Sequence, residues 1–84
     1  MYSILFNPKA EYQLRKLGKS IQERVLNALE RIKFRPFSFD VKRLQGTFYY
    51  RLRVGEYRVI IDIKQDKMVI IVIEIGHRKN IYKS

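Results

Sequence analysis

The stretch that decides the fold of this chain is Tyr50-Arg51-Leu52-Arg53-Val54-Gly55-Glu56-Tyr57-Arg58-Val59-Ile60. Basic and apolar residues alternate along it, which predicts two short β-strands folded back on each other at Gly55-Glu56. Glycine as the first of two turn residues favours a type II′ turn. A two-residue turn sets these cross-strand pairs: Val54 with Tyr57, Arg53 with Arg58, and Leu52 with Val59.

This pairing places Arg53 directly opposite Arg58, with Arg51 two residues along the same face of the hairpin. Like charges directly opposed across a sheet destabilise it. An anion bound between the guanidinium groups would explain why the chain carries them there. The alternative is a solvated basic face on which the guanidinium groups splay apart.

The composition fits one small basic domain spanning residues 1–84, near the lower size limit for an unaided hydrophobic core. Eighteen Lys and Arg residues against eight Asp and Glu give a net charge of +10. Such an imbalance indicates a polyanionic partner: nucleic acid first, an acidic protein second and an anionic membrane surface third.

The chain has no cysteine, which excludes a disulfide framework and a cysteine nucleophile and fits a reducing cytosol. We see no signal peptide, and the longest apolar run is too short to span a bilayer. The acidic residues are dispersed and His77 is the only histidine, so we expect no metal site and no cofactor.

The order of predicted elements is β-α-α-β-β-β. Asn7 is expected to cap a helix that begins at Pro8, and Ser20 with Glu23 predicts a capping box for a second helix that Pro36 stops. The predicted ranges are strand 2–6, helix 8–17, a helix from about residue 19, and strands 48–54, 57–63 and 68–75. This order predicts an α+β domain: an N-terminal strand, a two-helix hairpin and a three-stranded antiparallel meander, with about four strands and both helices on one face.

Two local features stay open. The aromatic connector at residues 34–39 either stacks RNA bases or locks its loop onto the core, and we favour the core. The register of the last hairpin depends on its loop, because a three-residue loop places Glu74 across from Arg58 and a two-residue loop flips that register. The nearly continuous apolar run of strand 68–75 predicts a central strand that is covered on both faces.

Topology gathers the basic residues at one corner. In an antiparallel meander, the end of strand 48–54, the start of strand 57–63 and the end of strand 68–75 meet at one edge of the sheet. Four arginines should therefore converge, with His77 and Tyr82 within a few residues of them: Arg51, Arg53, Arg58 and Arg78. We predict an anion site at this corner.

Three segments together resemble the RelE toxins of the RelE/ParE toxin–antitoxin superfamily. They are Lys42-Arg43-Leu44-Gln45-Gly46, the hairpin at residues 50–60, and Ile75-Gly76-His77-Arg78-Lys79-Asn80-Ile81-Tyr82. The resemblance covers nearly the whole chain. It implies a cytoplasmic, ribosome-dependent mRNA interferase, a hydrolase that cleaves messenger in the A site and is silenced by a cognate antitoxin.

The resemblance also implies roles for single residues. Arg51 and Arg53 match positions where other members carry lysines, while Arg58, Arg78 and Tyr82 match the phosphate-binding arginine, the basic residue after the last strand and the tyrosine near the C-terminus. Arginine is a poor general base, so proton transfer falls to Tyr82 or catalysis is mostly electrostatic. Neighbouring residues expected to bind substrate are Lys42, Arg43, His77 and Lys79.

The expected chemistry is attack of the RNA 2′-hydroxyl on the adjacent phosphate without a metal. A ParE-like inhibitor of DNA gyrase with no nuclease activity is the alternative, and a non-enzymatic RNA- or ribosome-binding module ranks third. The expected partners are an antitoxin, the ribosome and mRNA, with no membrane and no small-molecule cofactor.

Overall fold

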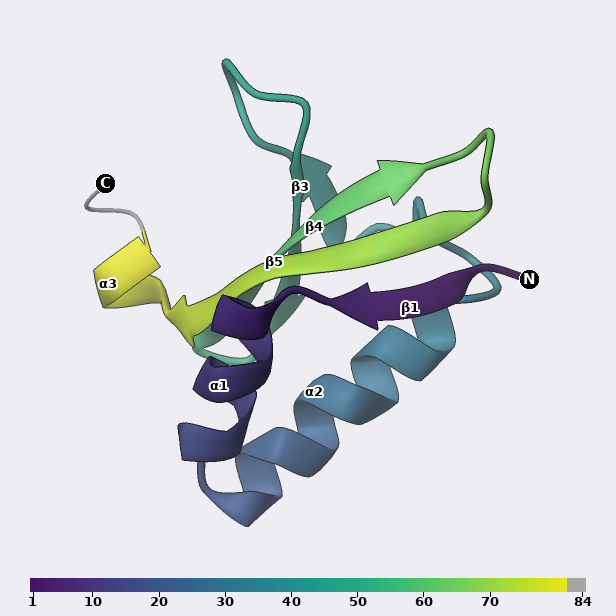
Figure 1. Cartoon of the computed structure of the whole chain (residues 1–84). Coiled ribbons are helices and arrows are strands. Elements are labelled where there is room, and N and C mark those ends of the chain that lie inside the picture. Colours follow the sequence, from purple (N-terminus) through teal and green to yellow (C-terminus); the bar gives the residue numbers. More distant parts are fainter. Residues whose placement is uncertain (82–84) are drawn as a thin grey trace.

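The computed structural model describes residues 1–81, which form a twisted five-stranded sheet with two helices beneath it (Figure 1). The strand order is β1-β5-β4-β3-β2; β1 runs parallel to β5 and the other neighbours are antiparallel. The elements, in chain order, are β1 (Ser3–Phe6), α1 (Pro8–Lys16), α2 (Lys19–Ile32), β2 (Val41–Arg43), β3 (Tyr50–Val54), β4 (Tyr57–Lys64), β5 (Val69–His77) and α3 (Arg78–Ile81). The predicted α+β class is confirmed, with one strand more than the four expected.

The extra strand is β2, in the basic stretch before Gly46. Val41 is apolar and 9% exposed, so its side chain enters the core while Lys42 and Arg43 stay exposed. The strand pairs antiparallel with β3, placing Val41 opposite Leu52. It forms the edge of the sheet beside the predicted hairpin.

The core lies between the helix layer and one face of the sheet. Its members alternate along the strands and recur along α2, because side chains on a strand point to opposite faces in turn. The fully buried side chains are Ile32, Leu52, Ile61, Ile70, Ile75, Val25, Val59 and Val72. Burying each Leu, Ile or Val contributes roughly 1.5–3 kcal/mol relative to leaving it in water.

The first helix begins as predicted, and the second does not. Asn7 Oδ1 accepts a hydrogen bond from the Ala10 backbone N–H at 2.8 Å, and Pro8 occupies the first turn. The prediction that Ser20 caps α2 is wrong: Gly18 is the N-cap, without a side-chain cap bond. Gln22 instead donates to the Leu17 carbonyl oxygen at 2.8 Å and holds the two helices together at their connection.

The hairpin at the centre of the sequence folds as predicted. Gly55 has φ +59° and Glu56 is not among the residues with positive φ, which is the pattern of a type II′ turn. All three predicted pairs are present, including Arg53 opposite Arg58. Strand β3 starts at Tyr50, two residues later than expected, because residues 44–49 form a protruding loop (Figure 1).

The register of the last hairpin matches neither of the two loops considered. Lys64 pairs with Val69, and an irregularity next to Ile60 shifts the rest of β5 by one residue. Glu74 is therefore opposite Ile60 and not Arg58, and its Oε1 lies 3.6 Å from Lys9 Nζ. The extra residue in β5 is a β-bulge, which no count of loop residues reveals.

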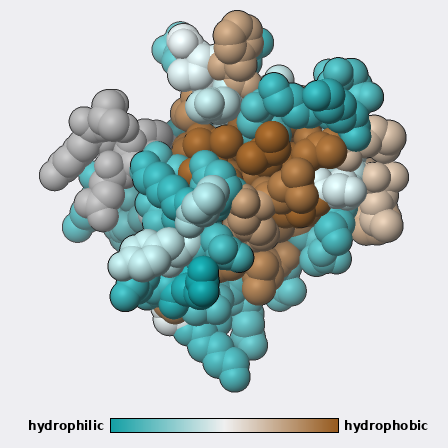
Figure 2. All heavy atoms as spheres, viewed as in Figure 1, coloured by the Kyte–Doolittle hydropathy of each residue, from teal (hydrophilic) through white to brown (hydrophobic). Residues whose placement is uncertain are grey.

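The other face of the sheet carries apolar residues on β1 and β5 and basic residues on β2 and β3. Leu5 is opposite Ile71, and both lie on the face away from the core because their neighbours Ile4 and Ile70 pack into it. Leu5 is 54% exposed and Ile71 is half-buried. Figure 2 shows apolar residues gathered over β4, β5 and β1. Among residues 1–81, the helix pair covers only the opposite face, so the expected cover on both faces of β5 is missing from this part of the chain.

None of the helices within residues 1–81 combines the length and the apolar character needed to cross a bilayer.

Candidate functional site

A basic pocket lies at the β2–β3–β4 side of this second face. It has a volume of about 290 Å³ and brings together residues from the α2–β2 loop and three neighbouring strands. The lining residues are Phe39, Asp40, Lys42, Arg51, Arg53 and Arg58. Three of the four arginines predicted to converge therefore share one hollow, as the hairpin register requires.

Arg58 is the buried member of this pocket. It is 7% exposed, and its Nη1 donates to the backbone carbonyl oxygens of Gly55 and Tyr57, each at 3.2 Å. These bonds hold its guanidinium against the turn. Burial lowers the pKa of Arg58, the positive charges of Arg51, Arg53 and Arg78 lower it further, and Glu56 opposes them. An arginine side chain does not deprotonate in proteins, so the guanidinium stays charged at neutral pH.

A buried cation among like charges is costly, and an anion offsets that cost. Phosphate is well matched, because guanidinium groups bind its oxygens through paired, charge-assisted hydrogen bonds. The low-dielectric surroundings of Arg58 strengthen such a contact compared with one in bulk water. The pocket thus has the charge and the hydrogen-bond donors that suit a phosphate group.

Arg78 reaches the same corner from the other side of the turn. Its backbone N–H donates to the Glu56 carbonyl oxygen at 2.9 Å, and its Nε lies 3.1 Å from Glu56 Oε1. Both side chains are about half exposed. Arg78 thus adds positive charge at the corner, but Glu56 partly neutralises it and ties the start of α3 to the β3–β4 turn.

Of the residues predicted to bind substrate, some line the basic pocket and others lie elsewhere. Lys42 lines the basic pocket, whereas Arg43 donates to the Thr47 carbonyl oxygen at 3.3 Å and lines a different hollow in the β2–β3 loop. His77 packs edge-on against Tyr57, and its Nδ1 accepts a hydrogen bond from the Lys79 N–H at 3.2 Å.

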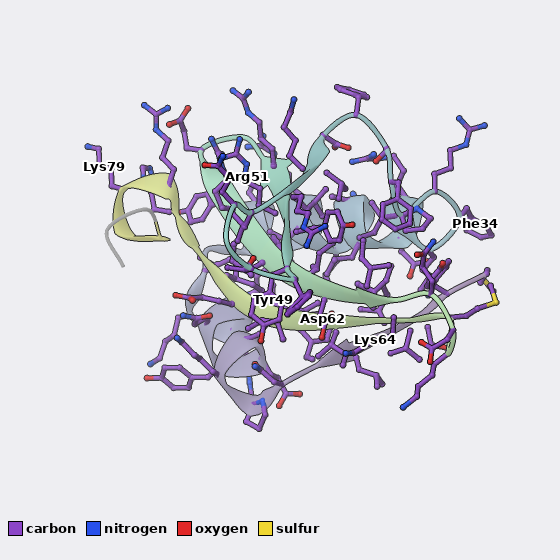
Figure 3. All side chains as sticks on the ribbon, turned by 90° about the horizontal axis from the view of Figure 1, so that it is seen from above. Phe34, Tyr49, Arg51, Asp62, Lys64 and Lys79 are labelled. Carbon is purple, nitrogen blue, oxygen red and sulfur yellow. The ribbon has the colours of Figure 1, made fainter. Side chains whose placement is uncertain are left out.

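That geometry makes His77 a residue of the strand-to-helix turn. Lys79 is exposed on α3, away from Arg51 (Figure 3). Tyr82 lies outside the described residues.

Sequence reasoning missed Arg24. It sits on α2, and its guanidinium lies against Gly55 so closely that a Cβ there would be 2.7 Å from Arg24 Nη2. Arg24 therefore places a positive charge at the β3–β4 turn on the helix side of the sheet. Nothing in the sequence pairs a helix position with a turn 31 residues away, and only the packing of α2 on the sheet does so.

Sequence reasoning also misjudged Phe39. The aromatic connector was expected to lock onto the core, and Phe37 does pack edge-on against Tyr50 with ring centroids 5.4 Å apart. Phe39, however, is 90% exposed and lines the basic pocket. Phe34 is also exposed but lies at the far side of the molecule from Arg51 (Figure 3).

Comparison with known proteins places the chain in a family. Residues 4–82 match the model of the ParE toxin of the type II toxin–antitoxin system parDE. The chain belongs to the ParE toxin family. It is also similar to RelE proteins: the RelE1 protein of Methanocaldococcus jannaschii is 29% identical over 99% of this chain and 97% of its own length. The predicted resemblance to the RelE/ParE superfamily is confirmed.

Solved structures of RelE toxins share the fold of this ParE-family chain. The isolated RelE toxin of E. coli superposes with a TM-score of 0.81 at 26% identity, covering 98% of this chain and 92% of that one. The RelB–RelE antitoxin–toxin complex from Methanococcus jannaschii gives a TM-score of 0.75 at 30% identity, with 93% and 94% covered. Fold and family are thereby shown.

Proposed function

We propose that this toxin is a ribosome-dependent endoribonuclease that cuts messenger RNA in the ribosomal A site. The observation that carries the proposal is the basic pocket, in which Arg51, Arg53 and the buried Arg58 surround one hollow. The overall charge of +10 supports association with a polyanion as large as the ribosome. In this role the protein acts in the cytoplasm and needs no cofactor.

The proposed reaction uses the RNA itself as nucleophile. The ribose 2′-oxygen attacks the adjacent phosphorus, the bond from phosphorus to the 5′-oxygen breaks, and the products are a 2′,3′-cyclic phosphate and a 5′-hydroxyl. The proton leaves the 2′-hydroxyl and one is delivered to the departing 5′-oxygen. Negative charge builds on the phosphoryl oxygens in between, and arginines fixed around them stabilise it.

The residues of the basic pocket have different roles in this reaction. Arg58, held by the carbonyl oxygens of Gly55 and Tyr57, is preorganised to grip the scissile phosphate. The RNA is positioned by the other cations of the pocket, Arg51, Arg53 and Lys42, which also add to its positive electrostatic potential. Arg78 adds positive charge from beside the β3–β4 turn. No arginine acts as the base, because its pKa is too high. We assign Tyr82 as the candidate base, as the family resemblance implies.

The proposed partner is an antitoxin that covers the second face of the sheet. Solved structures that share this fold include RelB–RelE complexes. Leu5, Ile71 and the basic pocket lie on the same face of the sheet, so an amphipathic segment with acidic residues at one end complements both areas. Such a segment would neutralise the arginines and keep RNA out of the pocket.

Inhibition of DNA gyrase without nuclease activity is the second candidate, because the family model that matches residues 4–82 is that of ParE. Inducing the protein in a bacterial host separates the two functions. The proposal predicts that translation stops first and that new mRNA 5′ ends map within ribosome-bound codons. Replication arrest with intact mRNA would instead support gyrase inhibition.

The matched variants are Arg53→Ala, which changes the pocket, and Arg15→Ala, which removes an exposed cation on α1 that pairs with Glu11. Loss of cleavage is expected only for the first. Equal cleavage by both variants would count against the pocket.

A further inference from the structure

We propose that Phe39 is a stacking platform for an RNA base, next to the pocket that holds the neighbouring phosphate. The inference rests on the proposed function and adds a recognition element to it. It concerns an aromatic side chain that is 90% exposed and yet lines the same hollow as Arg51, Arg53 and Arg58.

Exposure alone does not distinguish Phe39, because single exposed apolar residues are common on protein surfaces. Phe34 and Phe48 are exposed as well, at 68% and 84%. Neither of them lines the basic pocket. What sets Phe39 apart is an open aromatic ring beside three guanidinium groups, which is the composition of sites that bind single-stranded nucleic acid.

The backbone on both sides of Phe39 is fixed. Asp40 accepts hydrogen bonds from Arg31 Nη1 at 3.2 Å and from Ser38 Oγ at 2.8 Å, and Arg31 Nη2 bonds its second carboxylate oxygen. The Ser38 carbonyl oxygen accepts from the Val41 N–H at 2.9 Å, and the Asp40 carbonyl oxygen accepts from the Arg53 N–H at 3.1 Å.

These bonds anchor the residue before Phe39 to the residue after it, and they tie Asp40 to α2 through Arg31 and to β3 through Arg53. The ring is thus presented on a rigid turn, and stacking a base on it costs little ordering of the loop. The anchor includes Arg53, so the platform and the phosphate pocket share one backbone connection.

The pocket also has a suitable size and polarity. Its volume of about 290 Å³ is close to the lower end of small-molecule sites, roughly 300 Å³. Four cations line it, and its acidic member, Asp40, is already bound by Arg31. When a phosphate binds among these cations, the base of the same nucleotide can contact the Phe39 ring, which lines the same pocket. Every base has a π-face, so this contact adds affinity without demanding one sequence.

The test is a thermodynamic cycle between the ring and the base. The probe is a short single-stranded RNA with methylated 2′-hydroxyls, which cannot be cut, compared with the same strand carrying abasic residues. Binding to wild type, Phe39→Ala and Phe34→Ala is measured by fluorescence anisotropy at low salt. Phe39 is almost fully exposed, so Phe39→Ala should keep the thermal midpoint of wild type.

We expect Phe39→Ala to bind the base-containing strand about tenfold more weakly and the abasic strand as wild type does. Phe34→Ala should bind both strands as wild type does. Phe39→Tyr should keep the affinity and Phe39→Leu should lose it, because only an aromatic ring stacks. Equal weakening for both strands, or no weakening at all, would overturn the proposal.

A spectroscopic readout is available because the chain contains no tryptophan. Phe39→Trp should lose fluorescence when the base-containing strand binds and much less with the abasic strand, whereas Phe34→Trp should not respond. If neither strand binds to wild type, the platform is refuted. If Phe39→Ala weakens only binding of an antitoxin peptide, Phe39 is a protein contact and the proposal fails.

Failure of the proposed function would look different. Wild type that shows the ring–base coupling but leaves ribosome-bound mRNA intact would keep the platform and refute the nuclease.

Discussion

Arg53 and Arg58 lie directly opposite each other across β3 and β4, but Arg53 is exposed while Arg58 is only 7% exposed. The pair therefore carries one solvated and one desolvated cation on the same wall of the pocket. A solvated basic face, the alternative considered from the sequence, would leave both arginines in water. Burial of Arg58 is not consistent with that fully solvated face.

Replacing Arg58 should separate stability from binding. Arg58→Met keeps the length of the side chain. It removes a buried charge among like charges, which is stabilising, and the hydrogen bonds to the Gly55 and Tyr57 carbonyl oxygens, which is destabilising, so the free energy of unfolding should stay within about 1 kcal/mol of wild type. Affinity for the non-cleavable RNA should fall about tenfold or more, because a charge-assisted bond contributes roughly 1.5–3 kcal/mol. Chemical denaturation and anisotropy measure the two quantities. A clear loss of stability without loss of binding would contradict this role.

Glu56→Gln should strengthen RNA binding. Glu56 pairs with Arg78, and its negative charge offsets part of the positive charge of the pocket. The neutral glutamine removes that negative charge and the ion pair with Arg78. We expect an affinity gain of a few fold, roughly 0.5–1 kcal/mol at low ionic strength, which shrinks with salt.

The control is Asp66→Asn, which makes the same charge change in the exposed β4–β5 turn. Equal gains from both variants would show that only net charge matters.

Gly55→Ala should destabilise the fold and disturb Arg24. A Cβ at φ +59° costs roughly 1–2 kcal/mol, and it would also meet Arg24 Nη2 at 2.7 Å. Gly46→Ala is the control for backbone strain, because Gly46 has φ +77° with nothing within 4 Å of the added Cβ. Both variants should lose similar stability in urea titrations, and only Gly55→Ala should also weaken RNA binding. Unchanged binding would exclude Arg24 and the turn from the interface.

Acid should loosen the loop that presents Phe39. The hydrogen bond from Arg31 lowers the pKa of Asp40, helped by Ser38 and opposed by burial. Since the folded pKa lies below the unfolded value, this stabilisation is present above about pH 4 and is lost as pH falls through the folded pKa. The pair is partly exposed, so the contribution should be no more than about 1 kcal/mol.

The measurement is urea unfolding at pH 7 and at stepwise lower pH. Asp40→Asn should be less stable than wild type at pH 7, and the difference should close as pH falls below about 4. A difference that stays constant with pH would show that the carboxylate charge is not involved.

The part of the site that follows from hairpin geometry could be predicted from the sequence. The two-residue turn at Gly55 sets the register, the register sets Arg53 against Arg58, and the antiparallel connection brings Arg78 to the same end. Local rules also gave the Asn7 cap. The same rules predicted Ser20 as the N-cap of α2, which is wrong: the helix begins at Lys19, and Gly18 is its N-cap.

The rest depends on packing that no local pattern encodes. The bulge in β5 decides that Glu74 pairs with Ile60 and reaches Lys9. Arg31 bonds Asp40, the residue after the exposed Phe39, while Phe37 packs on Tyr50. Arg24 reaches Gly55 only because α2 crosses beneath the hairpin. Each case joins residues that lie on different elements, and their distances are fixed only when the sheet and the helices pack.

Cleavage of ribosome-bound mRNA at the basic pocket is tested most directly with purified components. Wild type and a folded Arg58→Gln variant are incubated with ribosomes that hold a defined mRNA with an empty A site. We predict that wild type yields fragments ending in a 2′,3′-cyclic phosphate and beginning with a 5′-hydroxyl, and that Arg58→Gln loses most of this cleavage. Intact mRNA with wild type, or cleavage by Arg58→Gln at the wild-type rate, would contradict the account.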